Sequence, residues 1–176
     1  MSPRIVVAPL SNDPLRDWPL AHFRELAELC VEKLDATVEF VGTRPQRLAV
    51  NEAIRALSSD RFINRCGKLS WSETSALIRS AACVVANNSG IAHLAAEWAV
   101  PAVSIFCGSH SPLEWMARGP GVVVITRRTV CSPCALGRIT ECPYDRRCFT
   151  SINAATVFRQ VQQLVSAPTH LRQPAD

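Results

Sequence analysis

The sequence predicts one α/β domain with a doubly wound, Rossmann-like parallel sheet. Short apolar runs alternate with longer amphipathic segments five times along the chain, which is typical of consecutive strand–helix units around such a sheet. The composition agrees, because 48% hydrophobic and 19% charged residues in a chain of 176 are enough to bury a substantial core. Doubly wound sheets bind ligands beyond the carboxyl ends of their strands, so functional residues are expected in the loops that follow strands.

Each expected element follows from a local pattern. Buried strands are expected at the short apolar runs, residues 4–8, 37–41, 62–63, 83–86, 102–106 and 122–125. Helices are expected from residues 18–19 onward, at 47–57, after the capping box of Ser70 and Glu73, at 90–98 and at 152–165. The domain should therefore span residues 1–166, with a Cys-rich loop at 126–150 and a flexible tail at 167–176.

Composition and the first residues exclude several classes of protein. The apolar run at residues 5–9 is too short for the core of a signal peptide, and no run reaches the roughly eighteen apolar residues of a membrane helix. A net charge of +4 is too small to indicate a nucleic-acid-binding protein. We therefore expect a cytoplasmic protein with no nucleic-acid partner, whose eight cysteines are reduced or bind metal.

A candidate anion-binding motif follows the fourth expected strand. Residues 87–93 read Asn-Asn-Ser-Gly-Ile-Ala-His and lead into a helix. The N–H groups and positive dipole end of a helix N-terminus bind phosphate, Ser89 adds a hydroxyl donor, and Gly90 allows a ligand to approach the main chain. His93, one turn further, would reach the edge of a diphosphate. The alternative is that Asn88 or Ser89 only caps the helix and that His93 is a half-buried packing residue.

Four segments together resemble glycosyltransferase family 9, which includes the lipopolysaccharide heptosyltransferases. The run NNSGIAHLAAEWAVPAVSIFCGSHSPLEW resembles the family signature D-[ST]-G-x-x-H-L-A-A-x-x-x-x-P, and residues 67–78 resemble G-x-L-[ST]-L-x-E-L-x-x-L-I. Residues 8–9 with 16–19 resemble H-P-G-[AS]…[KR]-x-W-P, and the cysteines at 131–143 resemble a Cys-containing segment of many members. The resemblance implies the C-terminal, donor-binding half of a GT-B glycosyltransferase.

The resemblance also implies a reaction and its partners. Such an enzyme transfers a sugar, with heptose as the first guess, from a nucleoside-diphosphate sugar to a lipopolysaccharide-type glycan or glycolipid acceptor, and no cofactor is required for the transfer. Peripheral contact with a membrane that carries the acceptor is compatible with this reading. The donor-binding residues would be Arg16, Leu69, Ser70, Asn88, Ser89, Gly90 and His93. Fixed cations and N–H dipoles among them would stabilise the charge that develops on the leaving diphosphate.

Two departures from the family pattern leave the activity open. Asn88 stands where the family usually has Asp, which removes a charge that would bind a sugar hydroxyl or order the loop. The chain begins at the first strand of the donor half. The acceptor domain and its general base are therefore expected in a missing half or in a separate acceptor-binding chain. For this reason no catalytic residue is assigned in this chain. The main alternative is a catalytically silent nucleotide-sugar-binding or scaffolding domain. A nucleotide-sugar epimerase is disfavoured because no G-x-G-x-x-G follows the first strand.

Four cysteines form a candidate metal site. The spacing Cys131-x2-Cys134-x7-Cys142-x5-Cys148 contains one C-x-x-C pair, which can bind a structural zinc ion together with two further thiolates. A metal would order a segment that has little periodicity of its own. Free or disulfide-bonded cysteines are the alternative. Five arginines lie nearby in the sequence and would either face an anionic acceptor or be solvated: Arg127, Arg128, Arg138, Arg146 and Arg147.

Overall fold

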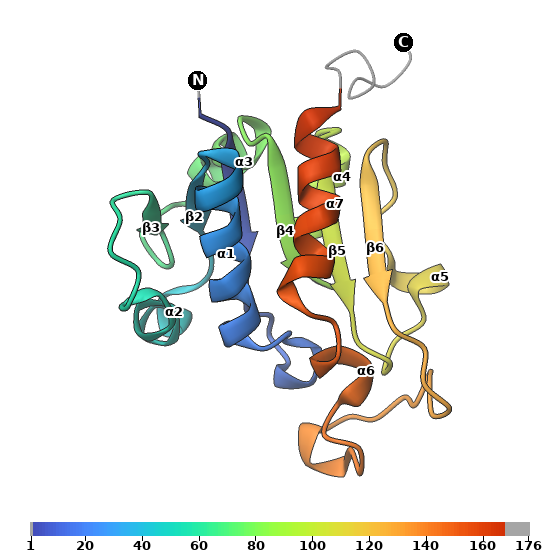
Figure 1. The fold of residues 1–176 in the computed structure, drawn as a ribbon. Helices are drawn as coiled ribbons and strands as arrows, with labels where there is room; N and C mark the ends of the chain where they lie inside the picture. Colours follow the sequence, from blue (N-terminus) through green and yellow to red (C-terminus); the bar gives the residue numbers. More distant parts are fainter. Residues whose placement is uncertain (1, 168–176) are drawn as a thin grey trace.

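The computed structural model describes residues 2–167 and confirms the doubly wound parallel sheet (Figure 1). Its strands are β1 (Arg4–Ala8), β2 (Thr37–Phe40), β3 (Phe62–Asn64), β4 (Cys83–Asn87), β5 (Ala102–Phe106) and β6 (Val122–Thr126). They lie in the order β3-β2-β1-β4-β5-β6, and every neighbouring pair is parallel. The direction of winding therefore reverses between β1 and β4, where such sheets bind their ligands.

Helices cover both faces of the sheet. One face packs against α1 (Leu20–Leu34), α2 (Arg47–Ile54) and α7 (Ala154–Ser166), and the other against α3 (Trp71–Arg79) and α4 (Gly90–Glu97). Shorter helical segments are η1 (Pro14–Arg16), η2 (Arg44–Gln46), α5 (Pro112–Trp115), η3 (Ile139–Glu141) and α6 (Arg147–Thr150). None of the helices within residues 2–167 is long and apolar enough to cross a membrane.

The two faces of the sheet have separate hydrophobic cores because successive side chains of a strand point to opposite sides. In β1, Ile5 and Val7 join the core beneath α1 and α7, whereas Val6 and Ala8 join the core beneath α3 and α4. Residues 5–8 of this central strand are therefore buried between the two cores. The loop after β1 therefore starts from a rigid position.

The structure corrects several expected boundaries. The first helix begins at Leu20 rather than at residues 18–19, and Pro19 occupies its N-cap position. The helix expected at 47–57 ends at Ile54. The last helix begins at Ala154 rather than 152, because the Asn153 side chain accepts a hydrogen bond from the N–H of Thr156 and so caps it there. Of the tail expected at 167–176, all but the first residue lies outside the described residues.

Candidate functional site

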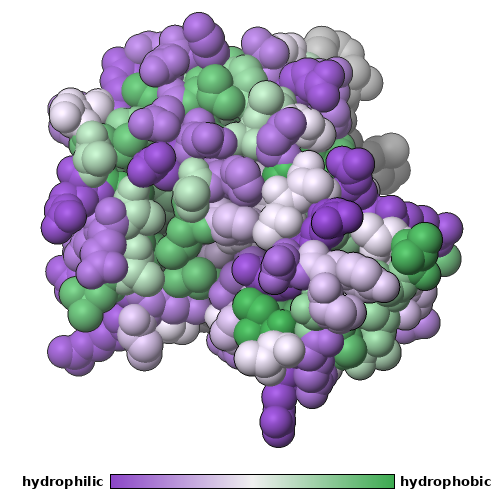
Figure 2. Space-filling model, turned by 60° about the horizontal axis from the view of Figure 1, so that its bottom comes forward, coloured by the Kyte–Doolittle hydropathy of each residue, from purple (hydrophilic) through white to green (hydrophobic). Residues whose placement is uncertain are grey.

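A cavity of about 510 Å³ lies at the carboxyl ends of β1 and β2, beside the reversal of the winding. Figure 2 brings this end of the molecule forward, and hydrophobic and hydrophilic side chains are interspersed on it. The cavity is lined by four loops and by the first turns of two helices: Ala8, Leu10, Ser11, Asn12, Arg16, Val41, Gly42, Thr43, Arg44, Gln46, Gly67, Leu69, Trp71, Thr74, Ser89, Gly90 and Ile91. These described lining residues include two arginines and no acidic side chain, so the cavity favours an anionic ligand.

The N-terminus of α4 opens into this cavity. Ser89 is the N-cap residue, yet its side chain makes no capping hydrogen bond. The Ser89 Oγ is buried and has no hydrogen-bond partner among the described residues. A methyl group added at Gly90 would meet no atom within 4 Å, so the space in front of the first turn is open. A hydroxyl donor and unpaired helix N–H groups thus face the same empty volume, which suits a phosphate.

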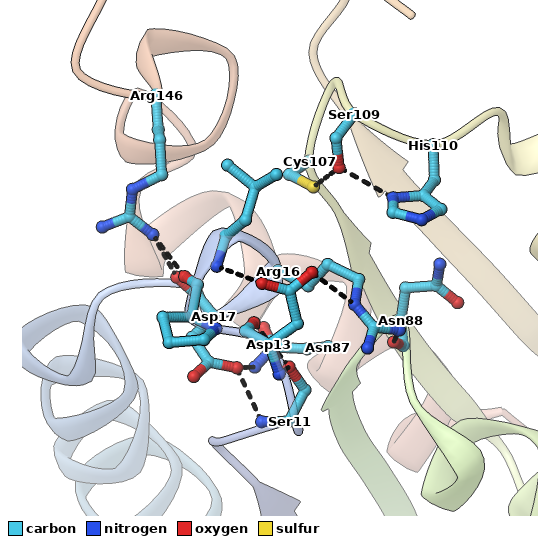
Figure 3. Close-up of polar contacts among 12 residues, drawn as sticks. Ser11, Asp13, Arg16, Asp17, Asn87, Asn88, Cys107, Ser109, His110 and Arg146 are labelled. Carbon is cyan, nitrogen blue, oxygen red and sulfur yellow. Dashed lines mark hydrogen bonds and ion pairs between the residues drawn. The ribbon is translucent and has the colours of Figure 1, made fainter. Parts of the chain in front are cut away.

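Arg16 lies beside this helix terminus at the end of η1 (Figure 3). Its Nη1 donates to the carbonyl oxygen of Asn88 at 3.4 Å, and its Nε lies 3.4 Å from Asp13 Oδ2. The second contact is an ion pair but not a well-aligned hydrogen bond, because Arg16 Nε has no hydrogen-bond partner among the described residues. Arg16 lines the cavity, so its guanidinium group can bind an anionic ligand there.

The loop that carries Arg16 is held by a buried amide. Asn87 Oδ1 accepts from the backbone N–H of Trp18 at 3.0 Å, and Asn87 Nδ2 donates to the carbonyl oxygen of Pro9 at 2.8 Å. The two contacts fix both ends of the loop between β1 and α1. The Asn87 side chain was not expected to have this role, although its position at the end of a fully buried strand was the available signal.

The same loop contains the partly buried carboxyl group of Asp17. Asp17 Oδ1 accepts from the N–H of Ser11 at 2.6 Å. Burial raises the pKa of the Asp17 carboxyl above its usual value, although the hydrogen bonds from Ser11 act in the opposite direction. Arg146 donates from Nη1 to the carbonyl oxygen of Asp17 at 2.7 Å, which ties the loop to the Cys-rich segment (Figure 3).

The part of the cavity wall that follows β3 includes aliphatic and aromatic side chains. Leu69 lines it, together with Trp71 and Thr74 from the first turn of α3. Trp71 is 66% exposed, although an indole is costly to leave in water. Gly67 has a φ of +65° and approaches the backbone of Arg44 too closely for a side chain, which brings the loops after β2 and β3 together.

The expected donor-binding residues divide into two groups. Arg16, Leu69, Ser89 and Gly90 line the cavity. Ser70 does not line the cavity. Its polar groups cap α3 instead: its hydroxyl accepts from the N–H of Glu73 at 3.3 Å, and its own N–H donates to Glu73 Oε2 at 2.7 Å. Asn88 is buried beside the cavity and reaches Arg16 through its carbonyl oxygen. His93 is exposed on α4 and is absent from the cavity lining, so its role stays a prediction.

A second polar cluster follows β5. Ser109 Oγ lies 2.8 Å from Cys107 Sγ and 2.7 Å from His110 Nδ1 (Figure 3). The His110 ring packs edge-to-face on Trp115. Ser109 is buried, so its hydroxyl fixes the orientation of the imidazole. None of these residues lines the 510 Å³ cavity.

The four candidate metal ligands lie in a separate cavity of about 540 Å³. Cys131, Cys134, Cys142 and Cys148 all contribute to its wall, and none of them forms a disulfide in the described part of the chain. No three Cys, His, Asp or Glu side chains among residues 2–167 are already arranged to hold a metal ion. The structure therefore brings the four thiols to one cavity without showing a formed metal centre.

Sheet order and cavity position define the class of the molecule as a doubly wound, Rossmann-like α/β domain with a ligand cavity at the reversal of the winding. Residues 1–143 match the family model described as Glycosyltransferase family 9 (heptosyltransferase), and the chain belongs to this family. Lipopolysaccharide heptosyltransferase 1 of Pseudomonas aeruginosa is 29% identical over 169 residues, which cover 89% of this chain and 46% of that protein.

Solved structures agree on the fold. The E. coli ADP-heptose LPS heptosyltransferase II superposes with a TM-score of 0.77 at 23% identity, over 93% of this chain and 46% of that one. E. coli heptosyltransferase WaaC, solved with ADP, gives a TM-score of 0.73 at 15% identity, over 93% of this chain and 44% of that one. The chain thus spans about half the length of these relatives.

Proposed function

We propose that the 510 Å³ cavity binds the nucleoside diphosphate of a sugar donor, and that the chain is the donor-binding part of a heptosyltransferase-type enzyme. The observation that carries this proposal is the buried Ser89 hydroxyl, which has no hydrogen-bond partner among the described residues and lies at the N-terminus of α4. A buried hydroxyl without a partner is costly unless a ligand supplies one. Arg16 adds a cation on the same wall.

This arrangement suits the departure of a nucleoside diphosphate. Negative charge grows on the diphosphate as the sugar–oxygen bond breaks. The Ser89 hydroxyl, the first N–H groups of α4 and the Arg16 guanidinium would stabilise that charge without having to reorganise. The loop that carries Arg16 is already held by Asn87, so its position does not depend on the ligand. No cofactor enters this account of the transfer.

Trp71 is proposed to bind the base. It lines the cavity together with Leu69, which follows β3, whereas Ser89 follows β4, and β2 and β1 lie between these two strands in the sheet. A nucleoside diphosphate placed with its phosphates at α4 would extend its base toward the exposed indole. Stacking on an aromatic face suits any base, so Trp71 would contribute affinity more than a choice among nucleotides.

The acceptor site is proposed to lie outside this chain. The relatives are about twice as long, and two of the three heptosyltransferases named above are lipopolysaccharide heptosyltransferases by name. A lipopolysaccharide-type glycan and a general base would accordingly be supplied by a further domain or by a separate acceptor-binding chain. Catalysis of transfer requires that group, because the acceptor hydroxyl must lose its proton.

A silent nucleotide-sugar-binding domain is the second candidate, and Asn88 favours it. A neutral amide there replaces the carboxylate expected from the family pattern, and Asn88 is buried next to Ser89 and Arg16. An Asn88→Asp variant separates the two candidates once an acceptor half is supplied. Transfer by the natural chain supports the enzyme. Transfer that appears only in the Asn88→Asp variant supports a silent domain.

Calorimetric titration with ADP, UDP and GDP tests the binding site directly. We expect saturable binding, weakened about tenfold to a hundredfold by Arg16→Ala or Ser89→Ala, because each removes a hydrogen bond to a charged group. Ser58→Ala is the matched control, since Ser58 is exposed between α2 and β3 and outside the cavity. A folded chain that binds none of the three nucleotides contradicts the proposal. Equal affinities for the Ser89→Ala variant and the natural chain contradict the phosphate position.

A further inference from the structure

The loop after β5 leaves the sheet beside the loop that carries Ser89. β4 and β5 are neighbouring parallel strands, and their pairing continues past the end of β4, because the N–H of Asn88 donates to the carbonyl oxygen of Ile105 at 3.1 Å. In Figure 3 the side chains of Asn88 and His110 extend toward each other from these two loops. A ligand that is held at Ser89 and continues past β4 therefore meets the loop that carries His110.

The start of the loop after β5 is held through both backbone groups of Gly108. Its N–H donates to Cys148 Sγ at 3.3 Å, and its carbonyl oxygen accepts from the N–H of Cys134 at 3.0 Å. A methyl group added at Gly108 would meet the Ser132 hydroxyl and the Cys148 sulfur, so the Cys-rich segment packs closely against this loop. The backbone that leads into His110 is therefore positioned before any ligand binds.

The imidazole of His110 is held through one of its two nitrogen atoms. Ser109 is 6% exposed, and its Oγ lies 2.7 Å from His110 Nδ1 and 2.8 Å from Cys107 Sγ. The other ring nitrogen, Nε2, makes no hydrogen bond within residues 2–167. Contact through Nδ1 thus sets the orientation of the ring and leaves Nε2 for a ligand.

Trp115 presents an exposed aromatic side chain next to this imidazole. It is 56% exposed, and the centroid of its ring lies 6.2 Å from that of His110. The short helix α5 that ends at Trp115 is nevertheless anchored. Arg118 Nη2 donates to the carbonyl oxygen of Leu113 at 2.9 Å, and Ala117 is buried in the core beneath α3 and α4. A fixed indole beside a polar nitrogen suits a sugar ring, which has apolar C–H faces and hydroxyl groups at its edge.

We propose that His110 and Trp115 bind the sugar of the donor, and that His110 Nε2 selects among sugars by a hydrogen bond to one hydroxyl group. This assignment rests on the function proposed above. The base and the sugar of a nucleoside-diphosphate sugar lie at opposite ends of the diphosphate. With the base at Trp71 after β3 and the phosphates at Ser89 after β4, the sugar extends toward the next strand in the sheet, β5. A hydroxyl both donates and accepts, so either neutral tautomer of His110 can bind it.

Calorimetric titration with ADP-heptose and with ADP separates the sugar from the nucleotide. The natural chain should bind ADP-heptose more tightly than ADP. His110→Ala should lower the affinity for ADP-heptose about threefold to tenfold, the contribution of one uncharged hydrogen bond. The affinity for ADP should stay unchanged, because His110 does not line the 510 Å³ cavity. Trp115→Leu should likewise weaken only ADP-heptose. His22→Ala is the matched control, since His22 lies in α1 and outside the cavity.

His110→Gln separates a hydrogen bond from simple packing. The glutamine amide donates and accepts at the end of a side chain of similar reach, so this variant should recover most of the affinity for ADP-heptose that His110→Ala loses. Nuclear magnetic resonance of the ¹⁵N-labelled chain gives a second readout. The His110 Nε2 signal should shift when ADP-heptose binds and stay in place with ADP. Nδ1 should move less, because it is already bonded to Ser109.

The sugar assignment and the nucleotide site fail in different ways. A natural chain that binds ADP and ADP-heptose equally tightly overturns the sugar assignment and leaves the nucleotide site standing. The same holds if His110→Ala binds ADP-heptose as the natural chain does, or if it weakens both ligands to the same extent. A folded chain that binds neither ligand contradicts the proposed function and, with it, the role of His110.

Discussion

At the level of one residue, a Trp71 variant can test the proposed base recognition separately from phosphate recognition. Replacing it with leucine, the residue expected there from the family pattern, should lower affinity for ADP about fivefold to a hundredfold, since base stacking contributes about 1–3 kcal/mol. Affinity for pyrophosphate should not change, because the proposed phosphate-binding residues Ser89 and Arg16 belong to the loops after β4 and β1, whereas Trp71 follows β3. Calorimetric titration with both ligands measures this.

Trp98→Leu is the matched control for Trp71. Trp98 is also partly exposed, but it stacks under Arg79 and donates to Ser75 Oγ at 3.1 Å, outside the cavity. ADP affinity should be the same in this variant and in the natural chain. If Trp71→Leu weakens ADP and pyrophosphate equally, the residue supports the shape of the site rather than the base.

Asp17 should make stability depend on pH. Burial raises its pKa from an ordinary value of 3.8, so the folded state holds a proton on this carboxyl over a range where the unfolded chain has lost it. The contribution of Asp17 to the unfolding free energy therefore falls as pH rises from about 4 through the raised pKa. Asp17→Asn removes this dependence and keeps an oxygen that accepts from the N–H of Ser11.

Urea unfolding at a series of pH values measures the effect of Asp17→Asn. The variant should show a flatter dependence of unfolding free energy on pH than the natural chain above pH 4. Asp60→Asn serves as control, because Asp60 is exposed in the turn before β3. Parallel curves for Asp17→Asn and the natural chain would show that burial of this carboxyl costs nothing.

The sequence was sufficient to predict the part of the cavity wall that depends only on the local backbone, at the N-terminus of α4. Ser89 and Gly90 were predicted from the position of a small polar pair between a strand and a helix, and both line the cavity. Asn87 and Arg146 were assigned no role there, because their partners lie 69 to 132 positions away in the chain. Such contacts depend on which strands become neighbours, and no local pattern specifies that.

At the level of elements, α3 depends on its capping box. Ser70→Ala removes the hydroxyl that accepts from the N–H of Glu73 and should lower the free energy of unfolding by about 0.5–2 kcal/mol. ADP affinity should stay unchanged, because Ser70 does not line the cavity. Urea unfolding and calorimetry of one preparation measure both quantities. Ser58→Ala, which removes an exposed serine between α2 and β3, is the control.

A different result for Ser70→Ala would restore the role that the family resemblance implies. Unchanged stability combined with weaker ADP binding would mean that the hydroxyl contacts the ribose or base rather than the helix backbone. The pKa of Glu73 is lowered by its hydrogen bonds with Ser70, whose hydroxyl also donates to Glu73 Oε2 at 2.7 Å, so the part of the capping stabilisation that comes from this carboxylate is present above pH 4.5 and is lost as pH falls through the lowered pKa. The Ser70→Ala effect should therefore shrink in acid.

Strands were easier to predict than helix ends for a physical reason. A buried parallel strand is a continuous apolar run, and Cys83–Asn87 and Ala102–Phe106 are buried along their whole length. Helix ends depend on single contacts that compete with one another. Asn153 caps α7 two residues later than periodicity alone predicts, and Asp35 ends α1 in the left-handed conformation. The short segments η1 and α5 contain too few residues for any period to show.

At the level of the whole molecule, the 510 Å³ cavity joins both halves of the sheet. Its loops follow β1, β2 and β3 on one side of the winding reversal and β4 on the other. A nucleotide bound there would have to leave before the domain unfolds. ADP at a hundred times its Kd should therefore raise the unfolding free energy by about 2.7 kcal/mol, provided that it binds only the folded chain.

Thermal unfolding at increasing ADP concentration tests this linkage. The midpoint should rise with the logarithm of ADP concentration in the natural chain and in Ser58→Ala, since Ser58 lies outside the cavity. At equal ADP concentration the rise should be smaller in Ser89→Ala, because a larger Kd leaves less stabilisation at the same ligand level. Equal rises in Ser89→Ala and the natural chain would place the stabilising site elsewhere in the molecule. An unchanged midpoint in every variant would mean that ADP does not bind the folded chain, and the polar groups at the N-terminus of α4 would then need another ligand.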